Sequence, residues 1–142
     1  MIRDIETFHT YVGRTIMHCQ TIEHDIKLIY AGMKAGNMDK TLDIIAEKRM
    51  TLGMVLKNLK ELDHSDNKPF FSESDYDLLK QITDIRNHWA HKAYCEFLYS
   101  DDENDFVRQA RRLENDHNRL EGLSETIEDV RFRVLRKYGR IE

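Results

Sequence analysis

The chain has 142 residues, of which 34% are charged and 40% hydrophobic, and its formal net charge is −4. The negative balance argues against a protein that coats nucleic acid nonspecifically, although it leaves room for a local anion-binding site. No apolar run approaches the roughly 18 residues of a membrane-spanning helix, and no signal peptide is recognisable at the N-terminus. We therefore expect a cytoplasmic protein with no membrane association.

Few residues in this chain interrupt a helix. It contains one proline and six glycines, and such a composition favours long amphipathic helices. A chain of this length usually forms one domain, so we expect residues 1–142 to be a single helical domain. Cys19 and Cys95 lack metal-ligand spacing, and we expect both to be buried free thiols.

The first two expected helices carry apolar stripes at helical spacing. The first helix covers residues 4–34, and Gly36 and Asn37 end it with a turn. Its stripe, spaced by three and four residues as in a helical bundle, consists of Ile5, Phe8, Val12, Thr15, Cys19, Ile22, Ile26, Ile29 and Met33. The second helix covers residues 39–62, and Arg49 interrupts its stripe. Arg49 is either a surface arginine that snorkels to solvent or a contact to a substrate phosphate.

Two further helices follow a polar loop at residues 64–69. The third covers residues 75–99, after a capping signal that begins at Ser72. A polar run at 100–104 separates it from the last helix, which covers residues 105–138 and which Gly122 could divide. The sequence lacks the alternation typical of strands. Four long helices with short links predict an all-α antiparallel bundle of four to five helices.

The most informative segment of the third helix is Arg86–His91, which reads RNHWAH. At about 100° per residue, Arg86 falls inside the arc that holds apolar side chains such as Ile85. Asn87 and His91 are four residues apart and share a face at the margin of that arc. A cation on an apolar face is costly unless an anion meets it. The sequence therefore points to this segment as the place where chemistry occurs.

This segment resembles the motif of the HEPN superfamily of small all-α proteins. The hallmark of that superfamily is an arginine, four to six further residues and then a histidine, often with asparagine directly after the arginine. Here the pattern is Arg86, Asn87, three further residues and His91. The resemblance covers six residues at the level of the motif and the whole chain at the level of long helices.

The resemblance implies a metal-independent endoribonuclease, commonly the toxin of a toxin–antitoxin pair or another defence protein. It also implies a homodimer in which two copies of the motif helix line one cleft, with Arg86, Asn87 and His91 as the site. RNA would be the substrate and an antitoxin protein a possible partner. Many such toxins carry a tyrosine two residues after the histidine, where this chain has Ala93. Tyr94 follows, and it is either a half-buried tyrosine of the bundle or, from its helical position close to Asn87, a contact that stacks on a base or bonds a phosphate.

The three motif side chains suit RNA cleavage on chemical grounds alone. RNA supplies its own nucleophile, the 2′-hydroxyl, and a neutral imidazole such as that of His91 can accept its proton. The guanidinium of Arg86 can bind the phosphate through two donors and offset the charge that develops on its oxygens. Asn87 could hydrogen-bond the imidazole and set its tautomer. The products would be a 2′,3′-cyclic phosphate and a 5′-hydroxyl.

Three alternatives stay open at this point. In the first, Arg86 pairs with an acid such as Glu23 and the chain is a structural bundle. In the second, the same fold binds a nucleotide or a protein without turnover. In the third, His88 and His91 join Glu23 and His24 in a metal site, but no second pair has matching spacing. We therefore expect no metal site and no cofactor.

Overall fold

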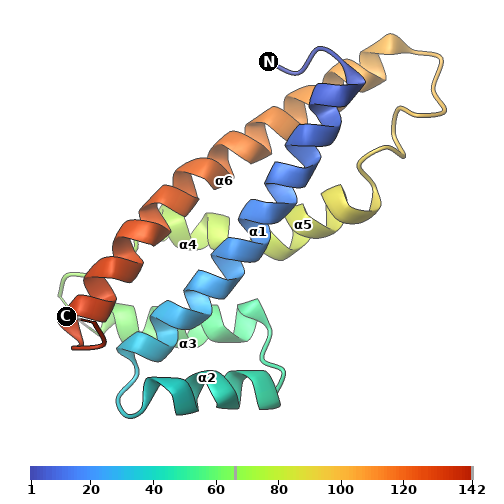
Figure 1. The fold of residues 1–142 in the computed structure, drawn as a ribbon. Helices are drawn as coiled ribbons and strands as arrows, with labels where there is room; N and C mark the ends of the chain where they lie inside the picture. Colours follow the sequence, from blue (N-terminus) through green and yellow to red (C-terminus); the bar gives the residue numbers. More distant parts are fainter. Residues whose placement is uncertain (66, 142) are drawn as a thin grey trace. The chain divides into compact units, whose positions relative to one another are not determined.

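The computed structural model describes residues 1–65 and 67–141. Within them lie six helices and no strand, and the helices are α1 (Ile5–Met33), α2 (Met38–Glu47), α3 (Leu52–His64), α4 (Glu73–Leu79), α5 (Ile82–His91) and α6 (Glu103–Lys137) (Figure 1). The predicted all-α class is confirmed. No helix in the described ranges combines the length and the apolar character that crossing a membrane requires.

The helices fall into two compact units. Unit 1 consists of Met1–Thr21 and Ile82–Ser124, and unit 2 consists of Ile22–Gln81 and Glu125–Glu142. Unit 1 therefore contains α5 with the first parts of α1 and α6, and unit 2 contains α2, α3 and α4 with the later parts of α1 and α6. The expectation of one domain over residues 1–142 stays a prediction.

Within each unit, α1 and α6 run in the same direction, which differs from the antiparallel order expected (Figure 1). The contacts that define this direction are Phe8 with Phe106 and His18 with Ser124 in unit 1, and Asp25 with Arg131 and Lys34 with Arg140 in unit 2. Neighbouring antiparallel helices need only a short link, whereas a parallel pair needs a long connection. Here four helices separate α1 from α6 along the chain, so the parallel order is possible.

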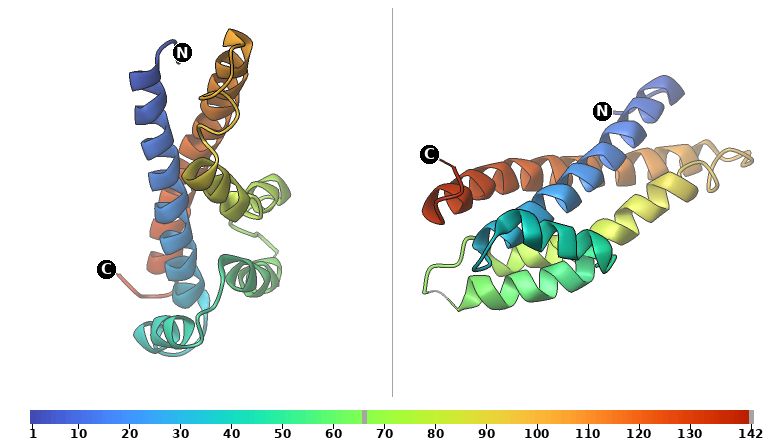
Figure 2. Two further views of the ribbon diagram at one scale, coloured as in Figure 1. Left: turned by 90° about the vertical axis from the view of Figure 1, so that its right-hand side faces the viewer. Right: turned by 60° about the horizontal axis from the view of Figure 1, so that its bottom comes forward.

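The second expected helix, over residues 39–62, is divided in two by a turn around Arg49 (Figure 2). Arg49 has a φ of 49°, and the amide of Met50 donates to the carbonyl of Ile45 at 3.0 Å. This pattern ends α2 as glycine commonly ends a helix. Thr51 then caps α3 by accepting from the amide of Met54. Arg49 therefore lies in a turn and not on a helical stripe.

The third expected helix, over residues 75–99, is also divided, into α4 and α5. It starts as predicted, because Ser72 caps α4 through a capping box with Asp75. No glycine or proline marks the break between Leu79 and Ile82, where the chain passes from unit 2 to unit 1. The predicted end of this helix at residue 99 is also wrong, because α5 stops at His91 and residues 93–99 form turns.

The buried carboxylate of Asp63 ties together the part of unit 2 around α3 and α4. Asp63 is 1% exposed, and it accepts bonds from the amides of Phe70 at 2.7 Å and Phe71 at 3.1 Å. The hydroxyl of Tyr76 on α4 donates to the same carboxylate at 2.7 Å. Burial, and then the hydrogen bond to Asp63 and the charge of that carboxylate, raise the pKa of Tyr76 above its ordinary value. A buried carboxylate needs such donors, because a charge without partners would be costly there.

Replacing Asp63 by Ala should lower the free energy of unfolding by about 3 kcal/mol, since three donors lose a charged acceptor. The measurement is urea denaturation followed by circular dichroism. Asp43→Ala is the matched control, because Asp43 is exposed on α2 and its loss should change stability by less than about 0.5 kcal/mol. Equal stability of the two variants would contradict the role given to Asp63.

Candidate active site

A hydrogen bond between Trp89 and Asp116 holds α5, the motif helix, in unit 1. Trp89 is 1% exposed, and its indole Nε1 donates to Asp116 Oδ2 at 2.9 Å. The other carboxylate oxygen of Asp116 lies 3.7 Å from the guanidinium of Arg119, and Arg112 lies over the indole ring at 5.8 Å. Because the donor is on α5 and the acceptor on α6, the bond fixes which face of α5 is turned inward.

Asn87 and His91 lie on the opposite face of the same helix. On a helix, residues two positions before and after Trp89 lie about 160° away from it, and both side chains are exposed. They line a surface hollow of about 350 Å³ together with Asp84, His88 and Lys92. The sequence predicts that Asn87 and His91 share a face at the margin of the apolar arc; the structure groups both at one hollow on the exposed side of α5.

Arg86 lies on the flank of the helix and is not among the residues that line this hollow. It is three positions before Trp89, which places it about 60° from the buried indole, and it is half-buried. On an ideal helix Arg86 and His91 are about 140° apart. Within unit 1 the structure therefore groups two of the three predicted catalytic residues around one hollow and leaves the third on a neighbouring face.

Tyr94 does not occupy the helical position expected for it, because it follows the end of α5. Its ring packs against Phe8 at 5.5 Å and Phe97 at 5.9 Å between centroids. Its hydroxyl is hydrogen-bonded to Nδ1 of His9 on α1, and burial raises its pKa. Tyr94 is thus part of an aromatic cluster, and it does not line the hollow of Asn87 and His91.

Arg49, the other predicted substrate contact, belongs to unit 2. It is exposed and lines a separate hollow of about 290 Å³ with residues of α1 and α2 that include His24 and Lys27. A substrate role for Arg49 stays a prediction.

His88 is the half-buried member of the hollow on α5. Its ring meets that of Trp89 edge-on, with centroids 4.6 Å apart, and its Nε2 is buried without a hydrogen-bond partner among the described residues. Burial lowers the pKa of His88, and the positive charge of Arg112 lowers it further. The side chain is therefore held in the neutral form, which cannot serve as a fixed cation for a phosphate.

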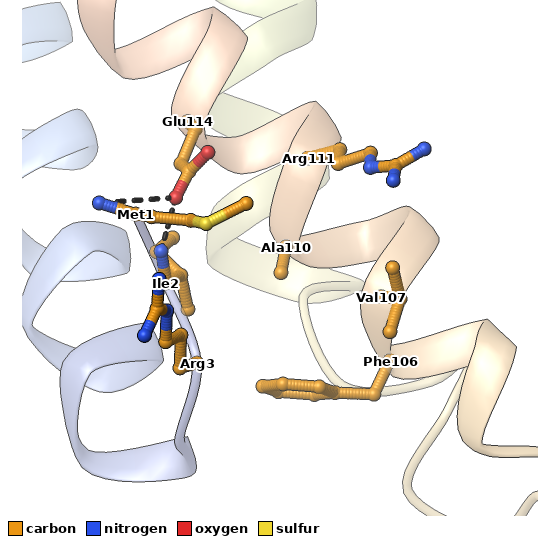
Figure 3. A pocket seen from close by; sticks show the side chains of 8 residues that line it. All are labelled: Met1, Ile2, Arg3, Phe106, Val107, Ala110, Arg111 and Glu114. Carbon is orange, nitrogen blue, oxygen red and sulfur yellow. Dashed lines mark hydrogen bonds and ion pairs between the residues drawn. The ribbon is translucent and has the colours of Figure 1, made fainter.

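A second hollow in unit 1 lies between the N-terminal residues and the start of α6. Figure 3 shows Glu114 beside Met1 and Ile2, with the ring of Phe106 at the opposite wall. Its volume is about 410 Å³, and the amino group of Met1 lies 3.6 Å from Glu114. The residues that line it include no histidine, so it offers no imidazole for proton transfer.

One group of potential metal ligands was missed at the level of the sequence. It consists of His18 on α1 with His117 and Glu121 on α6, all in unit 1. The spacing of His117 and Glu121, four residues apart on a helix, was the available signal. The expected candidates, by contrast, were Glu23, His24, His88 and His91. Cys19 is buried as expected, whereas Cys95 is exposed, because it lies in the turns after α5.

No protein-family model, no curated protein and no solved structure matches this chain.

Trp89→Phe should lower the free energy of unfolding by about 2 kcal/mol, because phenylalanine fills the site without the N–H donor and leaves Asp116 one bond short. Chemical denaturation monitored by circular dichroism measures this loss. Tyr99→Phe removes a polar group from a side chain that is 91% exposed and should have almost no effect. If Trp89→Phe were as stable as the parent, the bond would not be what holds α5.

Acidification should destabilise the fold through His88. Its native pKa lies below the ordinary value of 6.5, so the unfolded chain binds the proton first as the pH falls through about 6.5. The contribution of the neutral His88 side chain to the stability of the fold is complete above that pH and is lost below it. The melting temperature should therefore fall as the pH is lowered from about 7.5 to about 5.5. The melting temperature of His88→Gln should fall less over the same range. An equal fall in parent and variant would contradict this assignment.

Proposed function

We propose that this protein is a metal-independent endoribonuclease of the HEPN type that acts as a toxin or defence protein. The observation that carries the proposal is the pair Asn87 and His91, which is exposed in one hollow and follows Arg86 in the spacing of the motif. The assignment to this superfamily rests on that spacing and on the all-α class.

In the proposed reaction, His91 is the general base. Its neutral imidazole takes the proton of a 2′-hydroxyl, and the oxygen attacks the adjacent phosphorus. The bond to the 5′-oxygen breaks, and that oxygen takes a proton from solvent, which leaves a 2′,3′-cyclic phosphate and a 5′-hydroxyl. Asn87, one turn before His91, orients the imidazole. Arg86 offsets the charge on the phosphate oxygens.

The position of Arg86 favours a homodimer. Arg86 and His91 of one chain diverge by about 140° on the helix, so a single copy presents the base and the cation on different faces. A twofold axis beside α5 would bring Arg86 of one copy toward His91 of the other and complete two equivalent sites. An antitoxin protein could block such a cleft from outside. Tyr94 and Arg49 remain proposed as substrate contacts outside the catalytic hollow, since neither lines the hollow of His91.

The location of Arg86 also favours a second candidate, a HEPN-like bundle that binds a nucleotide or a protein without turnover. Without a guanidinium in the hollow, Asn87 and His91 still offer an amide and an imidazole, and Lys92 adds a cation. Such a site can hold a phosphate-bearing ligand but lacks the arginine that stabilises the transition state. This candidate predicts stabilisation by RNA or nucleotides with no product.

His91→Ala should reduce RNA cleavage by about 10²–10⁴-fold through loss of the general base, and Arg86→Ala by about 10²–10³-fold. Labelled RNA, separated by gel, shows the loss together with the cyclic phosphate end. Because His91 is exposed, the melting temperature of His91→Ala should match that of the parent. Addition of EDTA should leave cleavage intact.

His64→Ala is the matched control, because His64 is an exposed histidine of unit 2 that lines neither the hollow of His91 nor that of Arg49. This variant should cleave RNA at the parent rate. Cleavage by His91→Ala at the parent rate would overturn the proposal, and so would cleavage that EDTA abolishes. Binding of RNA without cleavage by the parent would favour the second candidate.

A further inference from the structure

Two helices of unit 1 bring two imidazoles and a carboxylate to one place, away from the motif residues in the sequence. His117 and Glu121 are four residues apart on α6, and Nε2 of His117 lies 3.6 Å from Oε2 of Glu121. His18 on α1 faces them, with its ring centroid 5.4 Å from that of His117. One ligand atom from each of the three residues lies within 4.8 Å of the other two.

The central member of this group, His117, is buried with an unsatisfied nitrogen. It is 5% exposed, and its Nε2 has no hydrogen-bond partner among the described residues. A buried polar atom without a partner is costly, and such an atom in a folded protein calls for an explanation. An electron-pair acceptor between Nε2 and the neighbouring ligands would remove that cost.

The other ring nitrogens are engaged in a way that suits metal binding. Nδ1 of His117 lies 3.2 Å from the side-chain oxygen of Asn118, and Nδ1 of His18 lies 3.3 Å from the hydroxyl of Ser124. An Nδ1–H that donates to an oxygen leaves the Nε2 lone pair free as a ligand, and ligating histidines commonly have such partners. The ring of Tyr11 packs against His117 at 4.7 Å and limits its rotation.

We propose that His18, His117 and Glu121 form a binding site for Zn²⁺. Two histidines and one glutamate are a donor set that zinc uses with water as a fourth ligand. Ligand atoms about 2.0–2.2 Å from a tetrahedral zinc are roughly 3.4 Å from one another, so ligand atoms that lie within 4.8 Å of one another have to approach by up to about 1.4 Å. The side chain of Glu121 is 57% exposed and has room for this movement.

The charges nearby permit a divalent cation. Glu121 supplies one negative charge, while the guanidinium of Arg14 opposes positive charge at His18. Arg14 is exposed, so water and salt screen its effect. The bound ion would join α1 to α6 within unit 1 and stabilise the native state over the unfolded chain.

This site is independent of the proposed ribonuclease reaction. None of the three ligands belongs to the Arg86–His91 segment, and the ion has no part in the cleavage step. Removal of zinc should lower the melting temperature while RNA cleavage persists below that temperature. The two proposals therefore succeed or fail separately.

Calorimetric titration of the EDTA-treated full chain with Zn²⁺ tests the site. We expect one ion per chain, a higher melting temperature when zinc is bound, and at least tenfold weaker binding in Glu121→Gln and in His18→Ala. Cobalt in place of zinc should give the visible absorption of a tetrahedral complex in the parent and not in His18→Ala. Glu125→Gln, which changes an exposed carboxylate one turn further along α6, should bind zinc like the parent.

Absence of stoichiometric zinc binding by the folded parent would overturn the proposal. Equal affinity of the parent, Glu121→Gln and His18→Ala would do the same, because binding would then lie elsewhere. His117→Ala removes a buried ring and could unfold unit 1, so the two more accessible ligands, His18 and Glu121, decide the outcome. Circular dichroism of each variant confirms that binding is compared among folded proteins.

Discussion

The bond from the indole of Trp89 to the carboxylate of Asp116 is the constraint on which the candidate active site depends. An indole N–H inside a core needs an acceptor, and a carboxylate inside a core needs a donor, so each group requires the other. Once Trp89 is turned inward, the helix geometry sends Asn87 and His91 outward and leaves Arg86 on the flank. The direction of one buried ring thus sets what the motif can present to a ligand.

Unit 2 contains the same kind of interaction, a hydrogen bond from a buried aromatic side chain to a buried carboxylate. The buried carboxylate of Asp63 accepts from the hydroxyl of Tyr76, as Asp116 in unit 1 accepts from Trp89. The two aromatic donors lie on α4 and α5, and each is satisfied within its own unit.

A single copy of unit 1 does not bring all three motif residues to one hollow. Asn87 and His91 share a hollow that Arg86 does not line, and for this reason the proposed ribonuclease reaction includes a second copy of the chain. The proposed zinc ligands form a separate group that ties α1 to α6. If both proposals hold, stability and chemistry in unit 1 depend on different histidines, and each can be changed without the other.

Local residue patterns were enough to determine the helical class, the start of α4 at the Ser72 cap and the shared face of Asn87 and His91, because these depend on neighbours three and four positions away. They could not reveal the turn at Arg49, the end of α5 at His91 or the parallel course of α1 and α6. Nor could they bring His18 to His117, which stands 99 positions later in the chain. Those features arise from contacts between distant segments, where buried groups must find partners, and only the tertiary structure supplies them.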